Sequence, residues 1–256
     1  MNRRHFLGGS ALAIGSFAAC TCPCLAGAPR VIESLGCVLT DADSDRIYPT
    51  GTATGRAVHG SEQVILRSGD RDFDLALAQT LLKISRALNV APGFAYYDDS
   101  EGMNAYATRR VQLNGADGTV LFGQRFLRRL MGGKENPEVA VAAVCAHEFG
   151  HILQFKHGLT DRVTNGDRTV KRVELQADFF SGFFAGLRKK ERPSYPAAVG
   201  ALAQYNVGDR SVNSPQHHGT PDQRGAAFVR GYDVAYKENR SLGEAIQISV
   251  NYASRL

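Results

Sequence analysis

The stretch from Ala140 to Gly158 constrains the fold most strongly, because it places ionisable residues among apolar neighbours. Within it, His147 and His151 are four positions apart and Glu148 follows the first histidine. A helix puts residues i and i+4 on one face, so both imidazoles can reach one metal ion. Glu148 is displaced by one residue, a position from which a carboxylate can deprotonate a metal-bound water. Burying such groups is costly unless they are paired or bind metal, which favours a Zn2+ site over a chance arrangement.

A second helix, expected from Val170 to Lys190, carries Glu174 and Asp178 one turn apart on a face otherwise rich in apolar and small residues. Two carboxylates that face a core are costly without a cation. Two histidines and one glutamate form a common catalytic zinc site, which keeps its fourth position for water. We therefore predict Glu174 as the third zinc ligand. Asp178 is predicted to accept the free ring N–H of a ligand histidine.

His157 is the competing third ligand, because its spacing from His151 matches that of the three-histidine metalloproteases. Those proteins have a glycine where this chain has Gln154, and the glycine lets the backbone turn so that the third histidine reaches the metal. With Gln154 we expect the helix to continue and to carry His157 to another face. The sequence therefore favours Glu174 and leaves His157 as the alternative.

The remaining pattern predicts a helix-rich α+β fold in which a small sheet containing antiparallel strands packs on the histidine-bearing helix. The edge of such a sheet can accept an extended peptide as an added strand. Capping residues predict helix starts at Asn136, Thr220 and Ser241, and a polar loop is expected between the two motif helices. The expected strands are Val64 to Arg67, Phe94 to Tyr97, Ala105 to Val111 and Thr119 to Gly123; the other helices are Asp70 to Asn89, Gln124 to Met131, Pro196 to Val207 and Pro221 to Glu238; the loop is Leu159 to Thr169.

Residues 1–28 are predicted to be a twin-arginine-type export signal, with Arg3 and Arg4 before a weakly apolar run that is too short for an ordinary membrane-spanning helix. Cleavage after Ala28 and lipid attachment to Cys20 both remain open. Residues 29–256 are then expected to form a single domain in the periplasm or cell envelope, with membrane contact only through a lipid on Cys20.

Composition narrows the class of partner. Hydrophobic residues make up 43% of the chain and charged residues 21%, which is ordinary for a globular protein. The formal net charge of +5 includes Arg3 and Arg4 of the predicted signal, and no dense basic run with interleaved aromatic residues follows. Nucleic acid is therefore not an expected partner, and a peptide or protein substrate is.

The paired motifs resemble those of a known group of enzymes. His147 to His151 and Glu174 to Asp178 are similar to the HExxH and ExxxD pair of gluzincin endopeptidases related to the CAAX prenyl proteases and the membrane heat-shock protease. They are also similar to a group of bacterial neutral zinc metallopeptidases in which the sequence ELQAD recurs. The resemblance implies a zincin-like fold and peptide-bond hydrolysis, with Glu148 as general base and zinc polarising the carbonyl.

Two further segments resemble elements of the same enzymes. Met103 to Ala107 is similar to their Asn-Ala-aromatic-Ala edge strand, which implies that Asn104 and Ala105 bind substrate. His218 to Arg224 is similar to a later His-x5-Arg element, which implies a supporting catalytic role for His218. The neighbouring His217 leaves open which of the two histidines acts.

One departure from these enzymes and two alternative functions accompany this prediction. No membrane-spanning segment is expected after the signal, so the membrane-embedded substrates of some of these enzymes are not carried over. A non-catalytic, zinc-stabilised peptide-binding or assembly factor is one alternative, although a purely structural site has no use for Glu148. A hydrolase acting on amide bonds of cell-wall peptides is the other, since its site chemistry is the same.

Overall fold

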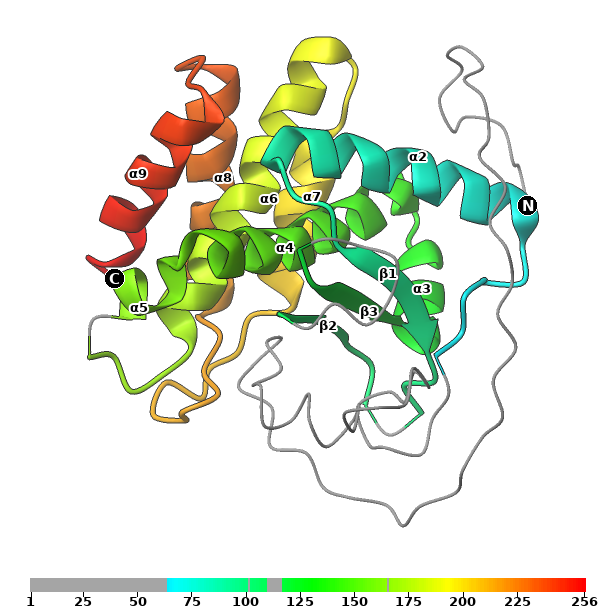
Figure 1. The fold of residues 1–256 in the computed structure, drawn as a ribbon, viewed down its shortest axis with the longest axis horizontal. Coiled ribbons are helices and arrows are strands. Elements are labelled where there is room, and N and C mark those ends of the chain that lie inside the picture. The colour runs from blue at the N-terminus through cyan, green and yellow to red at the C-terminus, as the bar shows by residue number, and fades with distance from the viewer. Residues whose placement is uncertain (1–63, 101, 110–116, 165) are drawn as a thin grey trace.

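A computed structural model describes residues 64–100, 102–109, 117–164 and 166–256 (Figure 1). The predicted export signal and Cys20 lie outside these residues. The described part is a helix-rich α+β structure with a small mixed sheet, as the sequence predicts. In chain order its elements are α2 (Arg71–Leu88), β1 (Gly93–Tyr97), β2 (Ala105–Thr108), β3 (Thr119–Gly123), α3 (Gln124–Met131), α4 (Pro137–His157), α5 (Leu159–Thr164), α6 (Lys171–Glu191), α7 (Ala197–Asn206), α8 (Pro221–Tyr236) and α9 (Leu242–Ala253).

The sheet has the strand order β1-β3-β2. β1 runs parallel to β3, with Ala95 opposite Leu121, and β2 runs antiparallel to β3, with Tyr106 opposite the same Leu121. Every residue of β3 is buried, as expected for a central strand. β2 is therefore an edge strand, in agreement with the prediction, although it ends at Thr108 and residues 110–116 lie outside the described part.

The strand predicted from Val64 to Arg67 is wrong. Only an isolated antiparallel bridge between Ile65 and Tyr96 forms there, at the free side of β1. Leu66 is 69% exposed, so the apolar residues that suggested a strand do not all find a buried face. A single bridged pair supplies too few cross-strand contacts to extend the sheet.

Helix α4 is buried on nearly all sides, which is why its sequence lacks a polar face. Pro137 is its first residue and Gly158 follows its last, as predicted. Asn136 stands at the predicted N-cap position, but it adopts a left-handed conformation and its side chain makes no capping hydrogen bond. The position of the cap is therefore predicted correctly, and the expected side-chain capping is wrong. By contrast, Thr220 and Ser241 both cap their helices, each in a reciprocal capping box.

The loop predicted after α4 is also wrong in part, because it contains the short helix α5. Leu159 and Val163 lie one turn apart on this helix and are completely buried. Two apolar anchors four residues apart in a polar stretch are enough to bury one face of a helical turn. The helix therefore gains its stability from packing rather than from its own sequence propensity.

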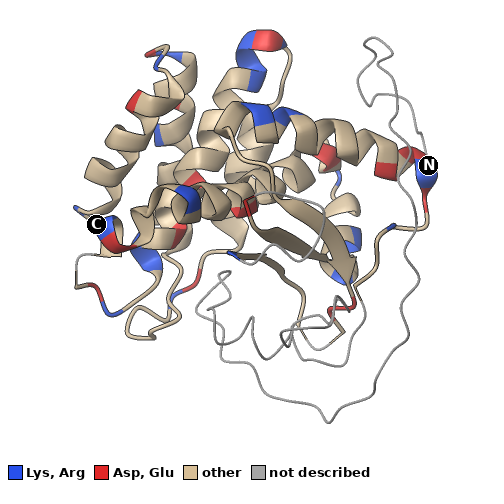
Figure 2. Ribbon diagram, viewed as in Figure 1, with Lys and Arg blue, Asp and Glu red and all other residues tan. Residues whose placement is uncertain are grey.

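Helix α4 lies between the sheet and the C-terminal helices (Figure 1). It contacts β2 and β3 on one side and packs against α6 on the other, and α6 packs in turn along α8. Lys, Arg, Asp and Glu residues are interspersed over the described helices (Figure 2). Among the described helices, none combines the length and the apolar character needed to cross a bilayer.

The contact between α6 and α8 depends on a pair of glycines. A methyl group on Gly182 would overlap the carbonyl oxygen of Phe228, and one on Gly231 would overlap the carbonyl oxygen of Phe179. The two helix backbones therefore touch directly, with one glycine from each side at the crossing. This close approach brings the side chains of the two helices within reach of each other near the start of α8.

We expect Gly231→Ala to lower the free energy of unfolding by roughly 3 kcal/mol, because the added methyl group forces two packed backbones apart. Chemical denaturation of both proteins measures the difference. Gly243→Ala is the matched control, since a side chain there meets no atom within 4 Å and alanine favours the helix. Equal stability of the two variants would contradict the direct backbone contact.

Candidate metal centre

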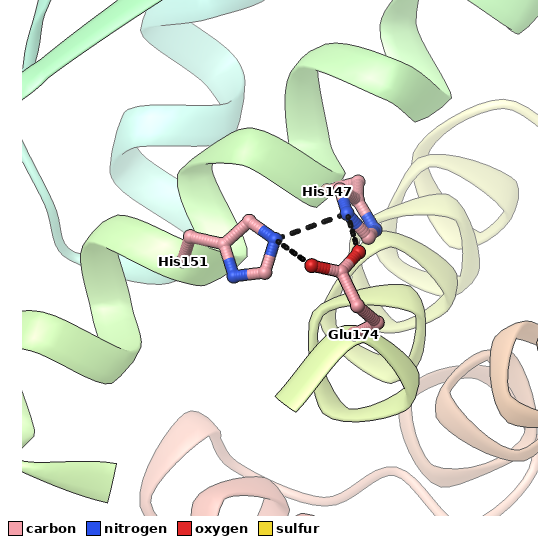
Figure 3. Close-up of side chains that lie close together, drawn as sticks. All are labelled: His147, His151 and Glu174. Carbon is pink, nitrogen blue, oxygen red and sulfur yellow. Dashed lines mark hydrogen bonds and ion pairs between the residues drawn. The ribbon is translucent and has the colours of Figure 1, made fainter. Parts of the chain in front are cut away.

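Three buried side chains from α4 and α6 converge on one point (Figure 3). His147 Nε2 lies 3.1 Å from His151 Nε2, and the Glu174 carboxylate reaches both rings, with Oε2 at 3.2 Å from His147 Nε2 and Oε1 at 3.5 Å from His151 Nε2. One potential ligand atom from each residue lies within 4.8 Å of the others. The structure thus places Glu174, 23 positions after His151 by its number, beside the histidine pair.

The outer nitrogens of both rings are already engaged as donors. His147 Nδ1 lies 2.8 Å from Asp178 Oδ1, and a carboxylate can only accept. His151 Nδ1 lies 2.8 Å from Gln154 Oε1, whose amide orientation is fixed because its Nε2 donates to the Val173 carbonyl. In their neutral forms the two imidazoles therefore direct Nε2 lone pairs towards each other and towards a carboxylate, an arrangement that a cation stabilises.

The observed separations fit a tetrahedral ion. Ligands about 2.0–2.1 Å from a tetrahedral centre lie about 3.3 Å from one another, and zinc accepts both imidazole nitrogen and carboxylate oxygen. The measured separations of 3.1, 3.2 and 3.5 Å lie on either side of that value. The three residues are therefore able to hold one metal ion, and the donor set is compatible with zinc.

The ionisation state of the Glu174 carboxyl is consistent with metal binding. Burial alone raises the pKa of its carboxyl, but the electrostatic effect of the adjacent His151 and His147 outweighs burial and holds the pKa well below its usual range. Glu174 is therefore an anion at neutral pH. It supplies a negative charge to a site whose two histidines are also buried.

Asp178 is positioned from a third helix. Arg224 of α8 donates from Nε to Asp178 Oδ2 at 2.8 Å and from Nη2 to Oδ1 at 2.9 Å, a bidentate pair. Burial raises the pKa of Asp178, but Arg224 and His147 reverse that effect and leave it lowered. The structure therefore places Asp178 where the sequence predicts it, in contact with His147, and adds Arg224 as the residue that fixes its orientation.

Gln154 performs the corresponding role for His151, and sequence reasoning missed it. Its Nε2 donates to Gln176 Oε1 at 2.9 Å, and Gln176 Nε2 donates to Ser249 Oγ of α9 at 3.0 Å. Gln154, Gln176 and Ser249 are all completely buried. The sequence indicates Gln154 only as a residue that keeps α4 helical, yet a glutamine three residues after a predicted ligand, in an apolar stretch, is itself a signal for such a role.

Glu148 lies beside this cluster at the wall of a cavity. It is 1% exposed, and its Oε2 has no hydrogen-bond partner among the described residues. Burial raises the pKa of this carboxyl to about 8, and the nearby Glu174 adds to the effect while His147 opposes it. A bound divalent cation would instead favour the ionised form. The carboxyl group of Glu148 is thus buried at the cavity wall, with one oxygen that makes no hydrogen bond within the described part of the chain.

The two late histidines occupy different environments. His217 is buried, with Nδ1 2.7 Å from Asp209 Oδ1, whereas His218 is partly exposed and lines the same cavity as His147 and Glu148. Asp209 also accepts from the backbone N–H of His218 at 2.8 Å. Asp209 therefore anchors this loop, and of the two histidines it is His218 that faces the cavity.

Asn104 borders the cavity as well, immediately before the edge strand β2. Its side-chain oxygen accepts from the backbone N–H of Ala105, and its carbonyl accepts from Gly123. Ala105 is buried in the sheet. Of the predicted substrate-binding pair, Asn104 therefore borders the cavity, whereas Ala105 is not among the residues that line it.

His157 is not brought to the cluster. Helix α4 continues without interruption through Gln154 to His157, as predicted, and His157 is exposed at its end. The cysteine in the same helix, Cys145, is fully buried and free. Of the candidate ligands in α4, the structure thus brings together His147 and His151.

No family model matches this sequence, and no curated protein or solved structure was found to be similar to it. The gluzincin resemblance therefore remains a prediction from the motifs. The functional inference is therefore based on the residues of the site and their geometry.

We expect His151→Ala and Glu174→Ala to abolish stoichiometric zinc binding, whereas His157→Ala retains it. Each of the first two variants removes one of three converging ligands, while His157 lies on the exposed end of the same helix. Elemental analysis after zinc loading and dialysis measures the content, and a zinc-dependent rise of the melting temperature provides a second readout. Zinc retention in Glu174→Ala together with its loss in His157→Ala would reverse the ligand assignment.

Gln154→Leu should weaken zinc affinity by about 10–100-fold, because His151 loses the acceptor that orients its ring. A competition titration against a zinc-binding dye measures the change. Gln247→Leu is the matched control, since Gln247 is an exposed residue of α9. Unchanged affinity in Gln154→Leu would show that the ring needs no such support.

Proposed function

We propose that this protein is a zinc-dependent endopeptidase of the gluzincin type, with a zincin-like fold. The observation that carries the proposal is the position of Glu148, a buried carboxylate with an unpartnered oxygen, directly beside three converging ligand side chains. A purely structural site would have no use for such a group. The cavity next to it gives a substrate access to this carboxylate.

His147, His151 and Glu174 would hold the metal, with Asp178 and Gln154 fixing the two rings. Zinc bound there would supply a Lewis acid that polarises a substrate carbonyl and makes water a better nucleophile at neutral pH. Three protein ligands leave room for substrate at a fourth position.

Glu148 acts as general base in this proposal. Its carboxylate accepts a proton from the attacking water and returns it to the leaving amine as the peptide bond breaks, so that the group ends the cycle ionised. His218, which lines the same cavity, would donate a hydrogen bond to the oxygen on which negative charge develops. The strand that begins at Asn104 is the edge on which an extended peptide would lie.

We also propose that the protein is exported from the cytoplasm. The predicted twin-arginine signal would deliver a folded, metal-loaded enzyme to the periplasm or cell envelope. Substrates there would be peptides or unfolded proteins. Attachment to the membrane would depend on whether Cys20 receives lipid.

We expect Glu148→Gln to reduce peptide cleavage by at least about a hundredfold while zinc content stays the same, because the amide cannot accept the proton. Hydrolysis of an internally quenched peptide library measures the rate, with Glu138→Gln, a change in the first turn of the same helix, as the matched control. Cleavage by Glu148→Gln at the wild-type rate would rule out the proposed mechanism.

A further inference from the structure

The cavity beside Glu148 extends along α4 away from the histidine pair. Ala140 and Val144 both line it, eight and four residues before Glu148 respectively, so the cavity follows a single face of the helix. Phe126 and Leu130 of α3 and Leu202 of α7 form further parts of its wall. Its volume is about 820 Å³, near the upper end for sites that bind small ligands and larger than a single side chain needs.

Apolar side chains are unusually exposed around this cavity. Met103 is 48% exposed, Leu202 57% and Val207 39%, and all three line it. Apolar residues that gather around a concave surface, rather than lying scattered, mark a binding surface. They come from three separate parts of the chain, so local sequence alone does not account for their clustering.

Among the exposed charged residues at the cavity wall, basic residues outnumber acidic ones. Arg129 and Lys134 line it and are exposed, with Glu135 as their acidic neighbour. Arg224 also reaches the cavity, but it is buried and paired with Asp178. The exposed charges are therefore predominantly positive, which disfavours a lysine or arginine side chain entering between apolar walls.

We propose that this cavity is the principal specificity site and selects peptides with a bulky apolar side chain next to the scissile bond and a further apolar residue beyond it. The occupant is the substrate itself, because the cavity is continuous with Glu148 at one end and with Asn104, at the start of the edge strand, beside it. Aromatic and branched aliphatic residues fill such a space, whereas acidic, basic and glycine residues do not. This specificity rests on the proposed endopeptidase function.

The first test compares cleavage of peptides that differ at one position beside the scissile bond. We expect Leu, Phe or Met there to give kcat/KM values at least about tenfold above those for Ala, Asp or Lys. Ala140→Phe fills the cavity from its α4 side and should abolish that preference while zinc content stays the same. An unchanged preference in Ala140→Phe, or a flat profile in the wild type, would overturn the proposal.

The second test uses binding, so that it does not depend on turnover. Fluorescence anisotropy of labelled peptides on zinc-loaded Glu148→Gln protein should show tighter binding of apolar peptides, weakened about tenfold or more by Leu202→Asp in that background. Leu75→Asp is the matched control, because Leu75 is 53% exposed on α2 and does not line the cavity. Equal effects of Leu202→Asp and Leu75→Asp would overturn the proposal.

The two tests separate this inference from the function on which it rests. Selective binding of apolar peptides without cleavage by the wild type would refute the peptidase and keep the specificity site. Cleavage that depends on Glu148 but shows no apolar preference would keep the peptidase and refute the site.

Discussion

The convergence of three electron-pair donors inside an apolar core is the interaction on which the rest of this structure depends. His147, His151 and Glu174 face one another with both ring Nδ1 atoms already committed to other partners. Such a group is costly to bury unless a cation lies among its members. The surrounding fold supports these three residues. Helix α4 is buried and packs against α6, while Arg224 of α8 and Ser249 of α9 belong to the hydrogen-bond networks that orient the two histidines.

The two histidines of the site are oriented by different kinds of chemical group. His147 is oriented by an ionic pair, Asp178 with Arg224, whereas His151 is oriented by neutral amides that end at Ser249. A carboxylate makes its imidazole a stronger electron-pair donor than an amide oxygen does. The two histidines are therefore not equivalent as ligands, because a carboxylate supports His147 and an amide supports His151.

The structure could be predicted from the sequence where residue chemistry and helical or strand periodicity indicate the same arrangement. Residues four apart on a helix must share a face, so the relation of His147 to His151 and of Glu174 to Asp178 could be predicted. The strand Thr119–Gly123 and the helix caps Thr220 and Ser241 could be predicted as well. The contact of Asp178 with a histidine followed from the rule that ligand rings need an acceptor. The strand at Val64 and the loop after Gly158 failed because burial in the folded chain decides such short segments, and local pattern does not reveal it.

Other parts of the site could not be predicted because they join segments far apart in the chain. Gln176 and Asp209 act through partners that only the packed helices identify. Arg224 ends the His-x5-Arg element, but the sequence does not reveal that its partner is Asp178. The cavity is a similar case, since Met103, Phe126 and Leu202 each resemble ordinary apolar residues until three elements meet.

The buried hydrogen bonds from Gln176 to Ser249 have a consequence for biosynthesis. Ser249 belongs to α9, which follows α4 and α6 in the chain, so during synthesis His151 and Glu174 are made before this supporting residue. Until α9 packs against α6, Gln176 lacks this acceptor and the hydrogen bonds that orient His151 are incomplete. The candidate metal site therefore reaches its final geometry only after α9 has been translated and packed.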